Sequence, residues 1–122
     1  MRIAVIGAGP AGLLAAAEAA KGGAAVTLFD KNEKAGKKLY ITGKGRCNVT
    51  NMRAPGEFLE FVVRNPKFLY GAIYSFTPEN TVELIESNGV KTKTERGNRV
   101  FPQSDKASDI TKALVKNAER CG

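Results

Sequence analysis

The sequence predicts an α/β fold that starts with a strand, a glycine-rich turn, a helix and a second strand. Residues 2–6 are a short apolar, β-branched run, typical of a parallel strand covered on both faces. A Gly-Ala-Gly-Pro-Ala-Gly turn at 7–12 then opens an alanine-rich helix to about residue 21, which Gly22 and Gly23 end. Residues 25–29 form a second apolar strand. This order is that of a Rossmann-type unit, which binds dinucleotides.

Composition sets broad limits on the class of protein. With 122 residues, 43% hydrophobic and 25% charged, the chain suits one modest globular domain and argues against disorder. It has no apolar run of about 20 residues to span a bilayer and no secretory leader at residue 1, so we expect a cytoplasmic protein without membrane contact. Cys47 and Cys121 form no CxxC pair, which favours two reduced thiols and no metal site.

The glycine turn has a mechanical interpretation at each of its positions. Gly7 permits the tight turn, Gly9 lets the backbone approach a pyrophosphate, and Gly12 allows close packing of helix on strand. The phosphates would lie on free N–H groups at the positive end of the helix, a contact worth about 0.3 to 1 kcal/mol per charge when exposed. The cofactor-binding residues expected here are Gly7, Ala8, Gly9, Pro10, Ala11 and Gly12.

Asp30 closes the second strand, 18 positions after Gly12. A carboxylate there can accept hydrogen bonds from the adenosine ribose and would repel the 2′-phosphate of NADP. The competing interpretation is a glycine-rich strand–helix turn that binds no ligand. The second strand and its terminal acid favour the dinucleotide site.

A strongly basic segment follows at residues 31–53. It contains seven basic residues and one acidic residue, so it holds +6 of the net charge of +7. The segment shows little periodicity and is predicted to be a long loop that can wrap a polyanion, with Arg46 able to make a bidentate phosphate contact. The plain alternative is a solvated charged loop.

The rest of the chain is predicted to be mainly helical. We expect helices over 57–65, 66–76 and 77–88, a hairpin of strands 90–95 and 99–102, and a last helix from Ser104 or Asp105 to about Glu119. An α/β domain normally continues into a further strand, so the chain is expected to be the front of a longer, two-domain protein. Its expected division is 1–53 for the Rossmann portion with the basic loop, 54–103 for a substrate-side insertion of helices and hairpin, and 104–122 for a helix returning to the first part.

Two motifs resemble a known family. Residues 37–51, KKLYITGKGRCNVTN, resemble the GRKLLISGGGRCNLTN segment of the BaiN-like (YhiN-like) bacterial flavoproteins, and 97–104 resemble that family's GRVFPxS stretch. The likeness implies FAD as the cofactor and an NAD(P)H-linked or oxidase-type reaction on a small-molecule substrate. It also implies that Lys31, Lys37 and Lys38 lie near the adenosine and phosphates, and that the middle of FAD is lined by Thr42, Gly43, Gly45, Arg46 and Asn48. Lys44 and Lys37 depart from the family's usual glycine and arginine.

Three functions remain open at this point. The first is an FAD-dependent oxidoreductase for which NADH or NADPH is the possible redox partner, with catalytic residues unidentified. The second is an RNA-modifying flavoprotein, which the interleaving of basic residues with glycines rather than aromatic residues disfavours, so no nucleic-acid partner is expected. The third is a non-catalytic, redox-sensing dinucleotide module. Cys47 could be a redox thiol, although a packing role is favoured.

Overall fold

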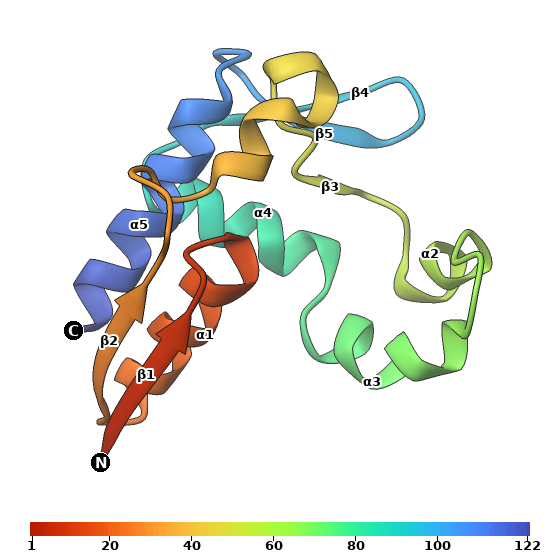
Figure 1. Ribbon diagram of the computed structural model, residues 1–122. Helices are drawn as coiled ribbons and strands as arrows, with labels where there is room; N and C mark the ends of the chain where they lie inside the picture. The colour runs from red at the N-terminus through yellow and green to blue at the C-terminus, as the bar shows by residue number, and fades with distance from the viewer.

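The strand–helix–strand unit lies at one end of the molecule in the computed structural model, which describes residues 1–122 (Figure 1). Strand β1 (Arg2–Ile6) leads into helix α1 (Pro10–Lys21), which returns the chain to β2 (Ala25–Phe29). The two strands pair in parallel, with Arg2 opposite Ala25 and Ile6 opposite Phe29. The first prediction of the sequence is therefore confirmed, including both helix ends.

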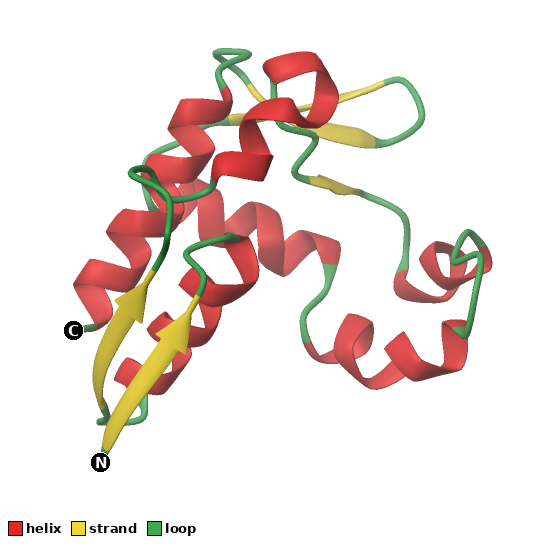
Figure 2. Cartoon of the chain, viewed as in Figure 1, coloured by secondary structure: helices red, strands yellow, loops and turns green.

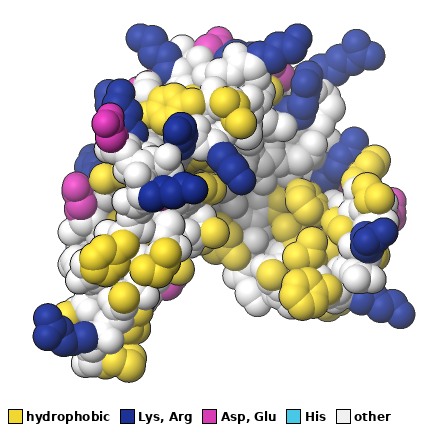
Figure 3. Space-filling model, viewed as in Figure 1, with side chains coloured by type: hydrophobic (Ala, Val, Ile, Leu, Met, Phe, Trp, Pro, Cys, Tyr) yellow, Lys and Arg dark blue, Asp and Glu magenta, His cyan; other side chains and the backbone are white.

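Within residues 1–122 the two-stranded sheet is covered on one face only, whereas the sequence predicted strands covered on both faces. Burial alternates along both strands, with Ile3 and Val5 turned towards α1. The opposite face exposes Ile6 and Phe29, and hydrophobic side chains gather there in Figure 3. The sequence could not show which face is exposed, because a continuous apolar run predicts a strand buried on both faces and does not show which elements cover it.

Helix α5 (Ala107–Cys121) packs along α1 and carries most of the hydrophobic core. The core side chains come from α1, α4, α5 and the basic segment of residues 31–53: Leu13, Cys47, Ile85, Ala107, Ile110, Ala113 and Leu114. The N-cap of α5 is Lys106, not Ser104 or Asp105 as predicted. Asp105 has φ +57, so the chain makes one more turn before the helix starts.

A second, antiparallel sheet of three strands lies near the start of α5. Strands β4 (Thr92–Glu95) and β5 (Arg99–Pro102) form the predicted hairpin, and a short strand β3 (Thr50–Asn51) pairs with the other edge of β5. The order is β3-β5-β4. Two residues of strand carry no period that a sequence reading can detect, so β3 was missed.

Three helices connect β3 to β4, and two of them project from the body (Figure 2). They are α2 (Pro55–Glu60), α3 (Pro66–Ser75) and α4 (Pro78–Ser87). The predicted helix over 57–65 starts earlier, with Pro55 in its first turn, and ends at Glu60. Asn65, which precedes Pro66 and has φ +52, begins the next helix. Helix α3 has no buried residue. None of the helices is long and apolar enough to cross a bilayer.

Candidate dinucleotide-binding site

The turn between β1 and α1 is held in a single tight shape. Gly7 has φ +102, a conformation that favours glycine. A Cβ on Gly12 would lie 1.8 Å from the carbonyl oxygen of Gly7, so helix and turn touch through their backbones. These two glycines are therefore required by the fold itself.

Gly9 differs, because nothing in the protein requires a glycine there. Its backbone is extended, with φ −75 and ψ 178, and a Cβ would meet no atom within 4 Å. An alanine could therefore occupy this position without strain or clash. The open space above the Gly9 backbone therefore fits a group from outside the chain that approaches the main chain closely, as a pyrophosphate does in this fold.

The helix end beside Gly9 offers unpaired hydrogen-bond donors. Helix α1 has no side-chain cap, and Pro10 occupies its first turn. The N–H groups of Ala11 and Gly12 donate to no group of the protein. Such donors at the positive end of a helix make an anion-binding position.

Asp30 lies against this turn. Its Oδ2 accepts a hydrogen bond from the N–H of Ala8 at 2.7 Å, and its Oδ1 accepts from the Asn32 N–H at 2.6 Å and from Asn32 Nδ2 at 2.8 Å. The bonds from Asn32, followed by that from Ala8, hold the pKa of the Asp30 carboxyl below its usual value. A carboxylate has about four acceptor sites, so at least one remains for a ribose hydroxyl.

Part of the basic segment borders the Asp30 side of the site. Lys31 and Asn32 line both a hollow at the strand ends, beside Gly7 and Asp30, and a second one with Lys34, Lys37, Tyr40 and Ile41. Lys37 Nζ donates to Asn32 Oδ1 at 3.4 Å. Lys38 is exposed. Of the lysines predicted for the adenosine end, Lys31 and Lys37 thus line these hollows, whereas Lys38 lines neither.

The middle of the basic segment is helical rather than a loop, which corrects the sequence analysis. Residues Lys37–Gly45 form η1, two 3₁₀ turns separated by a kink at Thr42, Gly43 and Lys44. A Cβ on Gly43 would lie 2.8 Å from the Phe101 ring and 2.9 Å from the Asn48 nitrogen. Packing therefore explains this glycine, whereas the sequence suggested ligand contact. Gly45 has φ +87 and Asn48 is exposed.

The Arg46 side chain is paired with other residues of the protein. Its Nη1 donates to Glu95 at 2.9 Å and to Asp105 at 3.2 Å, and its guanidinium lies 4.0 Å from the centre of the Phe101 ring. The Glu95 bond first, and then Asp105, raise the pKa of Arg46. The sequence led us to expect a free guanidinium for phosphate, because the acids that hold it lie 49 and 59 positions away. Similarly, the Thr42 hydroxyl donates to the Leu39 carbonyl.

Cys47 lies in the core. It is fully buried, and burial raises the pKa of its thiol. A buried thiol of raised pKa is a poor nucleophile, which agrees with the packing role favoured by the sequence analysis.

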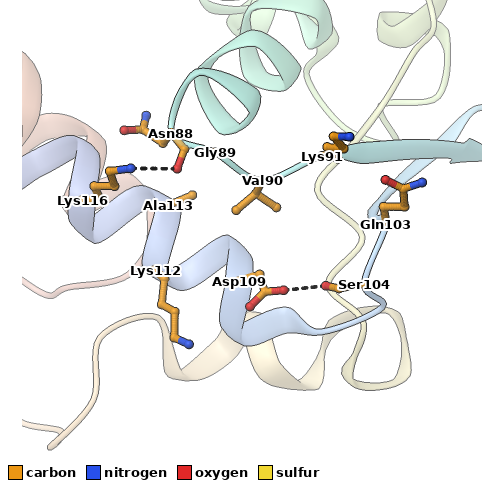
Figure 4. A pocket seen from close by; sticks show the side chains of 10 residues that line it. All are labelled: Asn88, Gly89, Val90, Lys91, Gln103, Ser104, Asp109, Lys112, Ala113 and Lys116. Carbon is orange, nitrogen blue, oxygen red and sulfur yellow. Dashed lines mark hydrogen bonds between the residues drawn. The ribbon is translucent and has the colours of Figure 1, made fainter.

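A further hollow lies between the end of α4, the hairpin and α5 (Figure 4). Two pairs of its lining residues are hydrogen-bonded to each other: Ser104 donates to Asp109 at 2.6 Å, and Lys116 Nζ donates to the Asn88 carbonyl at 3.4 Å. Lys112 points away from the hollow in Figure 4. The Lys116 bond ties α5 to the end of α4, whereas the Ser104 bond lies at the start of α5 itself.

The whole chain matches one family model. Residues 1–122 match the HI0933-like protein Rossmann domain. The chain belongs to this family. It is a family of FAD-binding Rossmann domains in oxidoreductases, so the resemblance drawn from the loop motif is confirmed.

The HI0933-like chain is also similar to named proteins. It is 35% identical over 121 residues to a 3-dehydro-bile acid delta(4,6)-reductase of Clostridium scindens, covering 98% of the chain and 29% of that protein. It is 34% identical over 117 residues to a ribosomal RNA dihydrouridine synthase of Escherichia coli, covering 95% of the chain and 28% of that protein. It is 39% identical over 100 residues to a thiamine thiazole synthase of Pyrococcus abyssi, covering 81% of the chain and 38% of that protein. The chain therefore spans less than a third of the length of the first two relatives.

Proposed function

We propose that this chain forms the ADP-binding part of an FAD-dependent oxidoreductase. The observation that carries the proposal is Gly9, an unstrained glycine with empty space where a side chain would stand, next to the free N–H groups of α1. Asp30 at the edge of the same turn supplies an acceptor for the ribose. Membership of the HI0933-like family supports the choice of FAD among the dinucleotides.

In this proposal the chain binds and orients the cofactor, and bound FAD supplies the hydride chemistry. The main chain of residues 7–12 holds the pyrophosphate, Asp30 the ribose, and Lys31, Lys37 and Lys38 the phosphates and adenosine. Thr42, Gly43, Gly45, Arg46 and Asn48 remain proposed for the middle of FAD, through backbone or unpaired side-chain groups. We propose a small-molecule substrate, NADH or NADPH as reductant, and a cytoplasmic location.

The test compares Gly9, in the turn before α1, with Gly71, which lies inside α3 and away from the turn. Gly9→Ala and Gly71→Ala each add a methyl group where no protein atom lies within 4 Å, and neither position has a positive φ. In the full-length protein we expect Gly9→Ala to bind FAD at least tenfold more weakly, because the methyl group occupies the phosphate space. Gly71→Ala should bind FAD as the wild type does. The measurement is titration of the apo-protein with FAD, followed by flavin fluorescence.

Equal FAD affinities of the two variants would refute the phosphate position. A full-length protein that purifies colourless and takes up no added FAD would refute the cofactor itself.

A second candidate function is RNA modification by a flavoprotein. It is favoured by the two relatives named ribosomal RNA dihydrouridine synthase, from Escherichia coli and Haemophilus influenzae, at 34% and 33% identity. Its substrate would be an RNA base instead of a free small molecule. Salt-dependent RNA binding, described below, separates the two.

A further inference from the structure

Gly36 lies in the segment between β2 and η1 and is hydrogen-bonded to the glycine turn. Its N–H donates to the carbonyl oxygen of Ala8 at 2.8 Å. The N–H of Ala8 in turn donates to Asp30 Oδ2 at 2.7 Å. Both main-chain groups of Ala8 are therefore bound to the segment that follows β2, so the turn is held from outside as well as by its own glycines.

The bond to Ala8 determines where the next N–H points. The peptide between Ala8 and Gly9 is trans, so its carbonyl and its N–H point in opposite directions. Because the carbonyl faces Gly36, the Gly9 N–H is turned to the opposite side of the peptide. It donates to no group of the protein, like the N–H groups of Ala11 and Gly12 in the next turn.

Helix α5 fixes the position of Gly36. Gly36 has φ +68, and a Cβ there would lie 2.9 Å from both Cγ2 and Oγ1 of Thr111. Thr111 is buried on α5, and its hydroxyl donates to the Ala107 carbonyl at 3.4 Å. A buried β-branched side chain on a helix has few other rotamers to adopt. The backbone of residue 36 therefore lies directly against α5, with no room for a side chain.

We propose that Gly36 and Thr111 are positioning residues of the dinucleotide site, an inference that rests on the function proposed above. Helix α5 sets the place of Gly36 through Thr111, and Gly36 aims the Gly9 N–H at the phosphate through the Ala8 carbonyl. Neither positioning residue contacts the ligand. A methyl group at position 36 would move this segment off α5 and weaken its bond to the turn, which would leave the Gly9 N–H present but misdirected.

The first experiment is a double-mutant comparison of FAD affinity in the full-length protein. Gly36→Ala should bind FAD about tenfold more weakly, the loss expected for one misdirected hydrogen bond to a charged group. In a Thr111→Ala background, which lacks the two atoms nearest to the added methyl group, the same change should weaken binding less than about threefold. Gly23→Ala should bind FAD as the wild type does, because Gly23 also has a positive φ, +83, but a Cβ there meets no atom within 4 Å.

The second experiment observes the peptide between Ala8 and Gly9 directly and needs no ligand. Full-length apo-protein labelled with carbonyl-¹³C alanine and ¹⁵N glycine gives NMR signals from Ala-Gly pairs alone, and the signal lost in Gly9→Ala is the one required. In Gly36→Ala the carbonyl-carbon resonance of Ala8 should move upfield, as for a carbonyl that loses a hydrogen bond, whereas Gly23→Ala should leave it in place. Gly36→Asn serves where Gly36→Ala fails to fold, since asparagine tolerates a positive φ and adds the same Cβ.

A folded Gly36 variant whose Ala8 resonance stays in place would overturn the inference and leave the proposed function intact. Equal losses of FAD affinity in Gly36→Ala and Gly23→Ala would also overturn it, as would a loss that is the same with and without Thr111. A wild-type protein that binds no FAD, together with an Ala8 resonance that moves as expected in Gly36→Ala, would refute the proposed function and support the link from α5 to the turn.

Discussion

The Asp30 side chain, which follows β2, is hydrogen-bonded to the turn after β1. Its carboxylate receives the Ala8 N–H from the turn and the Asn32 N–H from the segment that follows β2. These bonds fix the orientation of the carboxylate beside the turn for which we propose dinucleotide binding. They also make its charge state matter for the stability of the apo-protein.

We expect Asp30→Asn to lower the free energy of unfolding at neutral pH, with a difference from wild type that shrinks in acid. The pKa of Asp30 in the folded protein lies below the ordinary value of 3.8, so its contribution is fully present above 3.8 and is lost as the pH falls through the lowered pKa. Urea unfolding between pH 3 and 7 measures this difference. Glu33→Gln, at an exposed position without a hydrogen bond, is the control. A difference that stays constant to pH 3 would contradict the expectation.

At the scale of elements, α4 ties the projecting α2 and α3 to the core. Its residue Ile85 is buried among the core side chains. Its start is fixed by a capping box in which the Asn80 N–H donates to Thr77 Oγ1 at 3.2 Å and the Thr77 N–H donates to Asn80 Oδ1 at 3.0 Å. The direction in which the chain leaves α3 is set at this cap.

Thr77→Ala should therefore reduce the free energy of unfolding by about 1 kcal/mol, since it removes the N-cap hydroxyl. Ser87→Ala, at the exposed last residue of the same helix, should change it by less than about 0.5 kcal/mol. Chemical denaturation of the two variants beside wild type gives the comparison. Equal midpoints for both variants would show that the cap does not stabilise the helix.

At the scale of the molecule, the basic segment divides into paired and free charges. Arg46 and Arg53 form ion pairs with Glu95, Asp105 and Glu57. The lysines of the segment are exposed and form no ion pair: Lys31, Lys34, Lys37, Lys38 and Lys44. The charge open to an external polyanion is thus smaller than the sequence suggests and comes only from lysine.

If the second candidate function holds, full-length protein should bind single-stranded RNA with an affinity that falls as salt rises. Replacing Lys34, Lys38 and Lys44 with Gln should reduce the slope of log K against log salt by about 2, at about 0.7 per phosphate contact. Fluorescence anisotropy of a labelled RNA at several salt concentrations measures it, with Lys67→Gln on α3 as the control. An unchanged slope would assign these lysines no role in RNA binding.

The sequence alone determined the local elements and the cofactor turn. The β1–α1–β2 order, Gly7, Gly12 and Asp30 follow from patterns of a few consecutive residues, and short-range sterics enforce them: no residue larger than glycine fits at Gly12. The hairpin of β4 and β5 was predictable for the same reason.

Only the tertiary structure decided which charges and which glycines are free. The partners of Arg46 are separated from it by 49 and 59 residues, and Gly43 is explained by the ring of Phe101, which a local pattern cannot show. The reverse holds at Gly9, which has no neighbour within 4 Å and where we propose that a phosphate binds. Local patterns specify backbone conformation, whereas the availability of a group depends on contacts that form only when distant segments meet.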